Sequence, residues 1–182
     1  LHSARVVGAE ALLRWRDPPL GEVAPSRFIA VAEDSGFIVA LGDWVLTQAV
    51  RQGAAWYQRG MAMPIAINVS ALQFQQPQFV ERVAAVLAAS ALPPQLLELE
   101  LTESILVRDA DEALQRLQSL ARIGVRLSID DFGTGYSSLA YLKRFPIDKL
   151  KIDRSFVKGL PGDDSDGAIV VAILQMAAAL GM

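Results

Sequence analysis

Short apolar runs alternate with longer helical segments along most of this chain, and this alternation constrains its fold more than any other sequence feature. The runs are rich in Val, Ile and Leu, as buried strands are, while the segments between them carry apolar residues at helical spacing. This repetition predicts an α/β fold with a parallel sheet, either open or closed into a barrel. The expected strands are residues 6–15, 63–68, 96–100, 126–130 and 147–152, and the expected helices are residues 25–32, 41–59, 79–90, 109–123, 138–144 and 166–180.

Composition narrows the classes of function. The 182 residues suit one domain, and 52% hydrophobic with 20% charged residues is a globular profile. A net charge of −3 gives no basic surplus for gripping a polynucleotide, so we expect no such partner. The chain has no cysteine, and its single histidine is His2, which argues against thiolate sites, histidine-rich zinc sites and Ser-His-Asp catalysis.

Oxygen-bearing side chains fall within or at the ends of several expected strands. Glu10 lies in the first strand, while Asn68 and Glu100 end the second and third, and Asp130 with Asp131 follows the fourth. The carboxyl ends of parallel strands form one rim, where active sites of α/β proteins lie. Carboxylate and amide oxygens suit Mg²⁺, Mn²⁺ or Ca²⁺, and two such ions could hydrolyse a phosphodiester.

Other charged residues have simpler interpretations. We expect Asp109 to cap the helix that follows it, and a cluster of three aspartates to begin the last helix: Asp163, Asp164 and Asp166. Lys149 and Lys151 alternate along a strand and so share one face. Arg14 stands four residues after Glu10, and we expect both on one strand face, as an anionic substrate would require.

Together these residues spell the motifs of a known family. The chain resembles EAL domains through five motifs in family order: Glu-Ala-Leu at 10–12, Asn-Val-Ser at 68–70, Glu-Leu-Thr-Glu at 100–103, Asp-Asp-Phe-Gly-Thr-Gly at 130–135 and Lys-Leu-Lys-Ile-Asp at 149–153. The resemblance implies a TIM-like (β/α)₈ barrel that hydrolyses the bacterial second messenger cyclic di-GMP to linear pGpG. It also implies two ions, Mg²⁺ or Mn²⁺, with Ca²⁺ inhibitory.

The resemblance assigns a role to each site residue. It implies metal ligands at Glu10, Asn68, Glu100 and Asp130, and Asp131 as a ligand of the second metal ion. It also implies Glu100, Asp130 and Lys151 as catalytic residues, with Lys151 in contact with the attacking water. Leu13, Arg14 and Asp153 would contact substrate, Arg14 through a phosphate. Glu103 would brace the loop that contains Gly133 and Gly135. Residues 131–138 would link metal binding to homodimerisation.

Several expectations concern the chain as a whole. We interpret residues 1–182 as an EAL domain without the family's first strand and last two strands, hence a partial barrel. The alternative functions are an inactive EAL domain that serves as a cyclic di-GMP receptor, or a regulatory dimerisation module. Sensor or GGDEF-type domains would be possible neighbours in the full-length protein. We expect a bacterial cytoplasmic location, with a membrane anchor possible elsewhere in the protein.

Overall fold

The computed structural model describes residues 6–17, 19–107, 109–135 and 139–182. The chain folds as two compact units, Leu1–Leu99 and Glu100–Met182, here called the N-terminal and C-terminal units. Strand β5 (Leu97–Thr102) crosses the boundary between them. None of the helices within the described residues is both long and apolar enough to cross a membrane.

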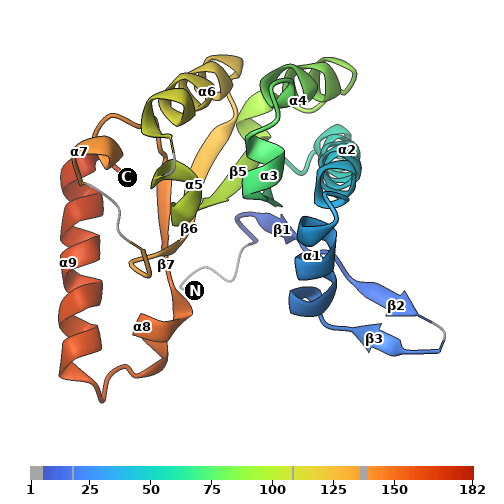
Figure 1. Cartoon of the computed structure of the whole chain (residues 1–182). Helices are drawn as coiled ribbons and strands as arrows, with labels where there is room; N and C mark the ends of the chain where they lie inside the picture. Colours follow the sequence, from blue (N-terminus) through green and yellow to red (C-terminus); the bar gives the residue numbers. More distant parts are fainter. Residues whose placement is uncertain (1–5, 18, 108, 136–138) are drawn as a thin grey trace. The chain divides into compact units, whose positions relative to one another are not determined.

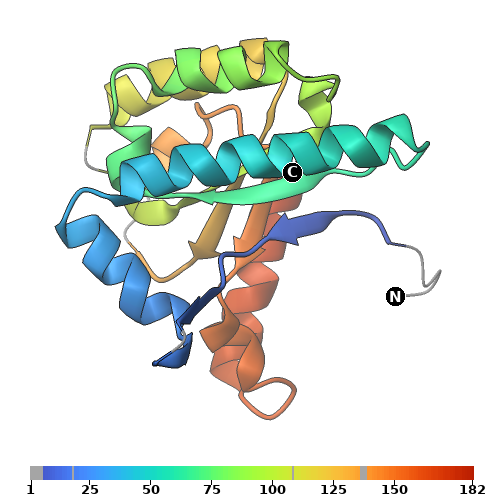
Figure 2. The same ribbon diagram turned by 90° about the vertical axis from the view of Figure 1, so that its right-hand side faces the viewer.

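The N-terminal unit is built around a parallel strand pair. Strand β1 (Ala9–Ala11) pairs with β4 (Ile65–Val69), and helices α1 (Pro25–Asp34) and α2 (Ile38–Gln58) come between them in the chain. Figure 2 shows α2 lying along β4. Short helices α3 (Ala71–Phe74) and α4 (Phe79–Ala88) follow, then a 3-10 turn at Pro94–Leu96. The core of the N-terminal unit includes Leu46, Val50, Ile67 and Val83, each at most 1% exposed.

An antiparallel hairpin departs from the expected alternation in this unit. Strand β2 (Trp15–Asp17) pairs with β3 (Gly21–Val23), with Trp15 opposite Val23. The expectation of one strand over residues 6–15 is therefore wrong, since the chain leaves β1 after Ala11 and enters a separate strand at Trp15. Each strand of the hairpin has only three residues, too few for an apolar pattern to predict it.

The C-terminal unit also contains a parallel pair. Strand β6 (Arg126–Phe132) pairs with β7 (Lys149–Ile152), with an irregular register between Ile129 and Phe132. Figure 1 shows the long helix α9 beside β7. The remaining helices of the unit are α5 (Glu103–Val107), α6 (Ala110–Ile123), α7 (Leu139–Leu142), α8 (Arg154–Lys158) and α9 (Asp164–Leu180).

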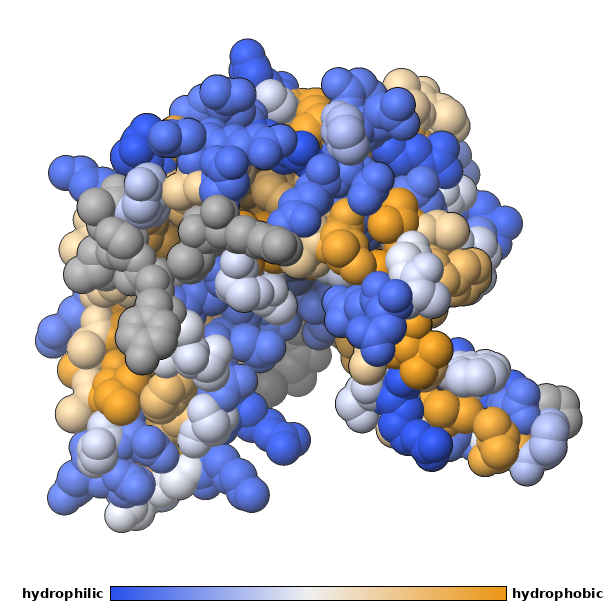
Figure 3. Space-filling view, in the orientation of Figure 1, coloured by the Kyte–Doolittle hydropathy of each residue, from blue (hydrophilic) through white to orange (hydrophobic). Residues whose placement is uncertain are grey.

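Helix ends in this unit follow local chemistry. Asp109 caps α6 by accepting a hydrogen bond from the Glu112 backbone N–H, as predicted, and Gly124 ends the helix at φ 97°. Asp163 caps α9 and accepts from the backbone N–H groups of Ser165 and Asp166, which confirms that the acidic cluster begins the helix. Helix α9 keeps apolar residues exposed, and apolar surface is visible along it in Figure 3.

Candidate active site

Glu10 and Asn68 lie together in the N-terminal unit. Glu10 is opposite Ala66 in the β1–β4 pair, and Asn68 follows two residues further along β4. The Asn68 Nδ2 donates a hydrogen bond of 2.8 Å to Glu10 Oε1. Both residues are exposed, so this pair presents a carboxylate and an amide to solvent, which are hard-cation ligands.

Lys151 joins two predicted ligands in the C-terminal unit. Its Nζ donates hydrogen bonds of 2.7 Å to Glu100 Oε2 and 3.0 Å to Asp130 Oδ2. Glu100 is only 3% exposed, so its charge requires a partner. Burial lowers the pKa of Lys151, but the hydrogen bonds and negative charges of Glu100 and Asp130 outweigh it and raise the pKa above its ordinary value. The ammonium therefore remains charged between two carboxylates.

Asp131 and Asp153 form a second acidic pair in this unit. Burial raises the pKa of Asp131, and the charge of Asp130 and a hydrogen bond with Asp153 raise it further, against the opposing charge of Lys151. Hydrogen bonds from Ser155 lower the pKa of Asp153, which also caps α8. Asp131 has a φ of 53°, a left-handed conformation uncommon outside glycine. Asp131 therefore lies near two other carboxyl groups, and the positive charge of Lys151 offsets their effect only in part.

Glu103 holds the loop after β6. Its Oε2 accepts hydrogen bonds from the backbone N–H groups of Gly133 and Gly135, at 3.2 and 3.0 Å. A Cβ atom on Gly135 would lie 2.9 Å from the Glu103 carboxyl carbon, so that glycine leaves room for the side chain. Glu103 is 4% exposed and begins α5, directly after β5. This carboxylate therefore fixes the loop through two backbone hydrogen bonds.

Leu13 and Arg14 lie between β1 and β2 rather than on a strand. The expectation that Arg14 shares a strand face with Glu10 is therefore wrong, because β1 ends at Ala11. The Arg14 Nη1 donates to the neighbouring Leu13 carbonyl at 2.8 Å, and the guanidinium stays exposed.

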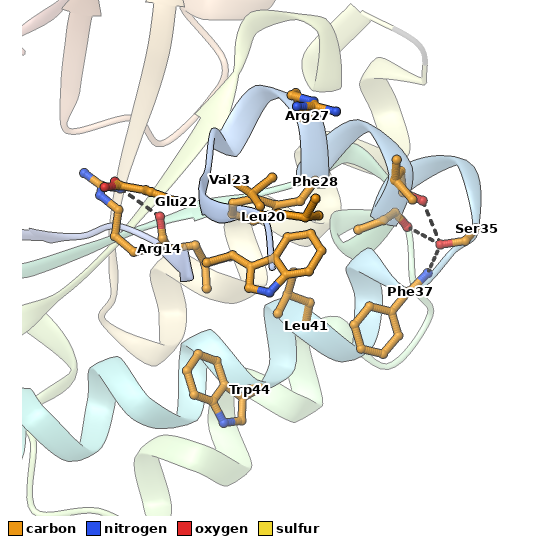
Figure 4. A pocket seen from close by; sticks show the side chains of 14 residues that line it. Arg14, Leu20, Glu22, Val23, Arg27, Phe28, Ser35, Phe37, Leu41 and Trp44 are labelled. Atoms are coloured by element: carbon orange, nitrogen blue, oxygen red, sulfur yellow. Dashed lines mark hydrogen bonds between the residues drawn. The ribbon is translucent and has the colours of Figure 1, made fainter. Parts of the chain in front are cut away.

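A pocket of about 800 Å³ opens beside these two residues, within the N-terminal unit. Figure 4 shows Arg14 and Glu22 at one end, with Ser35 and Phe37 at the other. Its walls come from the β2–β3 hairpin, α1 and the start of α2. Trp15 packs edge-on against Phe28 with ring centroids 5.9 Å apart. The pocket is mainly apolar with a charged end beside Arg14.

Comparison with known proteins identifies the family. The EAL domain model matches residues 1–182. The chain belongs to the EAL domain family. It is 48% identical over 178 residues to the bifunctional diguanylate cyclase/cyclic di-GMP phosphodiesterase MucR of Pseudomonas aeruginosa, covering 97% of this chain and 26% of MucR. It is 39% identical over 181 residues to the cyclic di-GMP phosphodiesterase PA2567 of the same organism, covering 100% of this chain and 31% of PA2567.

Comparison with solved structures supports the same family. The EAL chain superimposes on the MucR phosphodiesterase in its c-di-GMP complex with a TM-score of 0.94 and 48% identity, covering 98% of this chain and 72% of that one. This establishes the α/β fold of EAL structures, of which this chain represents part of a TIM-like barrel. The chain spans about a quarter to a third of the length of these curated relatives.

The donor chemistry of this EAL domain suits divalent cations. Within the described residues, no three Asp, Glu, His or Cys side chains converge on one point as a ready metal site. Each unit instead holds part of the oxygen set, and burial together with the negative charge of Asp130 raises the pKa of Asp131. A cation at that place would relieve the repulsion. The residues therefore fit hard divalent ions.

Two features of the EAL site escaped sequence reasoning. The coupling of Asp131 to Asp153 depends on a register irregularity between β6 and β7, which no sequence pattern announces. The pocket depends on the hairpin, whose strands of three residues are too short to give a periodic signal.

Proposed function

We propose that this EAL domain is a metal-dependent phosphodiesterase that hydrolyses cyclic di-GMP to linear pGpG. The observation that carries the proposal is Lys151 held between Glu100 and Asp130, since these three residues combine a retained ammonium with two carboxylates. Relatives named as cyclic di-GMP phosphodiesterases support the substrate.

Each unit carries proposed metal ligands of its own. These are Glu10 and Asn68 in the N-terminal unit, and Glu100, Asp130 and Asp131 in the C-terminal unit. Two ions, Mg²⁺ or Mn²⁺, would neutralise the phosphodiester and supply an activated water when bound. We expect Ca²⁺ to inhibit, because its larger and looser coordination fits an in-line displacement poorly.

The chain's own residues then have distinct tasks. Glu100 and Asp130 would hold the ions, and their attraction for Lys151 would then be weaker. The Lys151 Nζ would donate a hydrogen bond to the attacking water and stabilise the negative charge that develops on that oxygen.

Substrate positioning belongs to three further residues. Arg14 is exposed and always charged, so its guanidinium can bind a phosphate of the dinucleotide. Leu13 offers an apolar contact beside it. Asp153 lies next to Asp131 and would contact the substrate or its water shell from the start of α8. Glu103 braces the loop through Gly133 and Gly135.

The wider setting is also proposed. Residues 131–138 would link metal binding to homodimerisation, although residues 136–138 lie outside the described structure. Sensor or GGDEF-type domains would accompany the EAL domain, as the greater length of its relatives supports. A cytoplasmic location suits an intracellular second messenger.

The test is direct assay of the complete protein. Cyclic di-GMP would be incubated with Mg²⁺ or Mn²⁺, with and without a chelator, and pGpG followed by chromatography. Glu100→Gln should abolish the metal-dependent product, while Glu81→Gln, which changes an exposed carboxylate on α4, should not. Binding of intact cyclic di-GMP without pGpG would replace the phosphodiesterase with the receptor function.

A further inference from the structure

Helix α8 forms a second support for the loop that Glu103 holds. The Asp153 backbone N–H, just before α8, donates a 3.3 Å hydrogen bond to the Phe132 carbonyl. One turn later, Phe156 packs on the same loop. A Cβ atom built on Gly133 would lie 2.9 Å from Phe156 Cε2, and 3.3 Å from Ile173 Cδ1 of α9. Helices α8 and α9 thus meet the loop at Gly133.

Gly133 is therefore restrained in two ways. Its N–H binds Glu103, while its Cα faces the Phe156 ring and Ile173 without room for a side chain. Its φ of 102° is also open mainly to glycine. Ile173 is 8% exposed and Phe156 is half-buried, so the aromatic ring rests on a packed helix rather than in solvent.

The restraint reaches Asp131 through a tight turn. Thr134 Oγ1 donates a 2.9 Å hydrogen bond to the Asp131 carbonyl, which closes the turn around Phe132 and Gly133. Asp131 itself holds a left-handed φ of 53°, a conformation that persists only where its surroundings enforce it. A shift of Gly133 toward the space of a smaller residue at 156 would relax this turn.

We propose that Phe156 is a positioning residue that holds Asp131 in place for the second metal ion. This inference rests on the proposed phosphodiesterase function. Glu103 fixes the loop by hydrogen bonds, and Phe156 fixes it by contact at the same glycine. The first metal site, through Glu100 and Asp130, stands on strands and does not depend on this contact.

The test compares three variants of the complete protein: Phe156→Ala, Phe156→Leu and the control Val157→Ala. Val157 is adjacent on α8 and 48% exposed. In metal-free protein, hydrogen exchange at Gly133 and Gly135 should accelerate about tenfold in Phe156→Ala, because the loop opens more often. Phe156→Leu should restore most of the protection, and Val157→Ala should match the wild type.

Metal binding gives the second measurement. Titration of Mn²⁺ followed by electron paramagnetic resonance should show the weaker of two sites losing about tenfold in affinity in Phe156→Ala, with the tighter site unchanged. With substrate, kcat should fall about tenfold while KM changes little, as loss of alignment predicts. Unchanged exchange and unchanged Mn²⁺ affinities in a folded Phe156→Ala would overturn the inference. A wild-type protein that neither binds Mn²⁺ nor forms pGpG would instead overturn the proposed function.

Discussion

The two units carry their predicted ligands in different electrostatic settings. In the N-terminal unit, Glu10 is exposed and receives a hydrogen bond from the neutral amide of Asn68. In the C-terminal unit, Glu100 is buried and shares the ammonium of Lys151 with Asp130. An exposed carboxylate is stabilised by water, whereas a buried one needs an opposite charge supplied by the fold. The two sets of ligands should therefore respond differently to substitution.

The largest effect is expected at Lys151, where catalysis and folding depend on one group. Lys151→Met should lower kcat about 10³-fold, in the range for loss of a proton-handling or water-orienting group. It should also destabilise the metal-free protein by about 3 kcal/mol, because a buried Glu100 charge loses its partner. Turnover assays and urea unfolding would measure both. Lys149→Met, an exposed change on the same strand, is the control, and equal losses in both variants would contradict the assignment.

Asn68→Ala should separate metal binding from folding. We expect Mn²⁺ affinity to fall between about 10-fold and 100-fold, as for loss of a ligand or its close partner. Stability of the metal-free protein should change by no more than about 1 kcal/mol, since the lost hydrogen bond is exposed. Calorimetric Mn²⁺ titration and thermal unfolding provide the two readouts. A large loss of stability here would mean that the two units do not differ as described.

Arg14→Ala is expected to act on substrate alone. Removal of its exposed guanidinium should raise KM for cyclic di-GMP about tenfold, the value of one charge-assisted contact, with the melting temperature unchanged. Arg16→Ala, an exposed change on β2, is the matched control. Steady-state kinetics would distinguish them, and a fall in kcat with constant KM would instead place Arg14 in the chemical step.

The smallest effect is expected from pH, through Asp131. Its folded pKa is raised, so its contribution to metal-free stability is fully present below its ordinary value of 3.8 and is lost as pH rises through the folded pKa. Metal binding needs the ionised form, so Mn²⁺ should bind more weakly as pH falls through that same range and should release a proton. Mn²⁺ titrations across pH in Asp131→Asn should lose part of this dependence. An identical pH profile in wild type and variant would assign the effect to other groups.

Sequence reasoning located the strands that carry Glu100 and Asp130 because their apolar runs are long and end in acidic residues. It also placed the caps Asp109 and Asp163, since capping depends on residues two or three positions apart. It missed the hairpin of β2 and β3, whose pairing is set by the antiparallel return of the chain rather than by a hydrophobic pattern.

Sequence reasoning also missed a short helix. Helix α8 has five residues, fewer than two turns, so hydrophobic periodicity could not reveal it. The contact of Phe156 with Gly133 joins residues 23 positions apart in the chain, and only the folded path from β6 to α8 brings them together. The role of Glu103 came from family resemblance, because nothing local links it to glycines 30 residues away.

The Lys151 ammonium supplies positive charge to the site when no metal ion is bound. The ammonium is bound to the carboxylate oxygens that an incoming ion would take. A metal ion would therefore have to displace the ammonium. Removal of metal should then return the ammonium to both carboxylates, which offsets part of their mutual repulsion. An ion would then bind only if its interaction with Glu100 and Asp130 is more favourable than the ammonium interaction that it replaces.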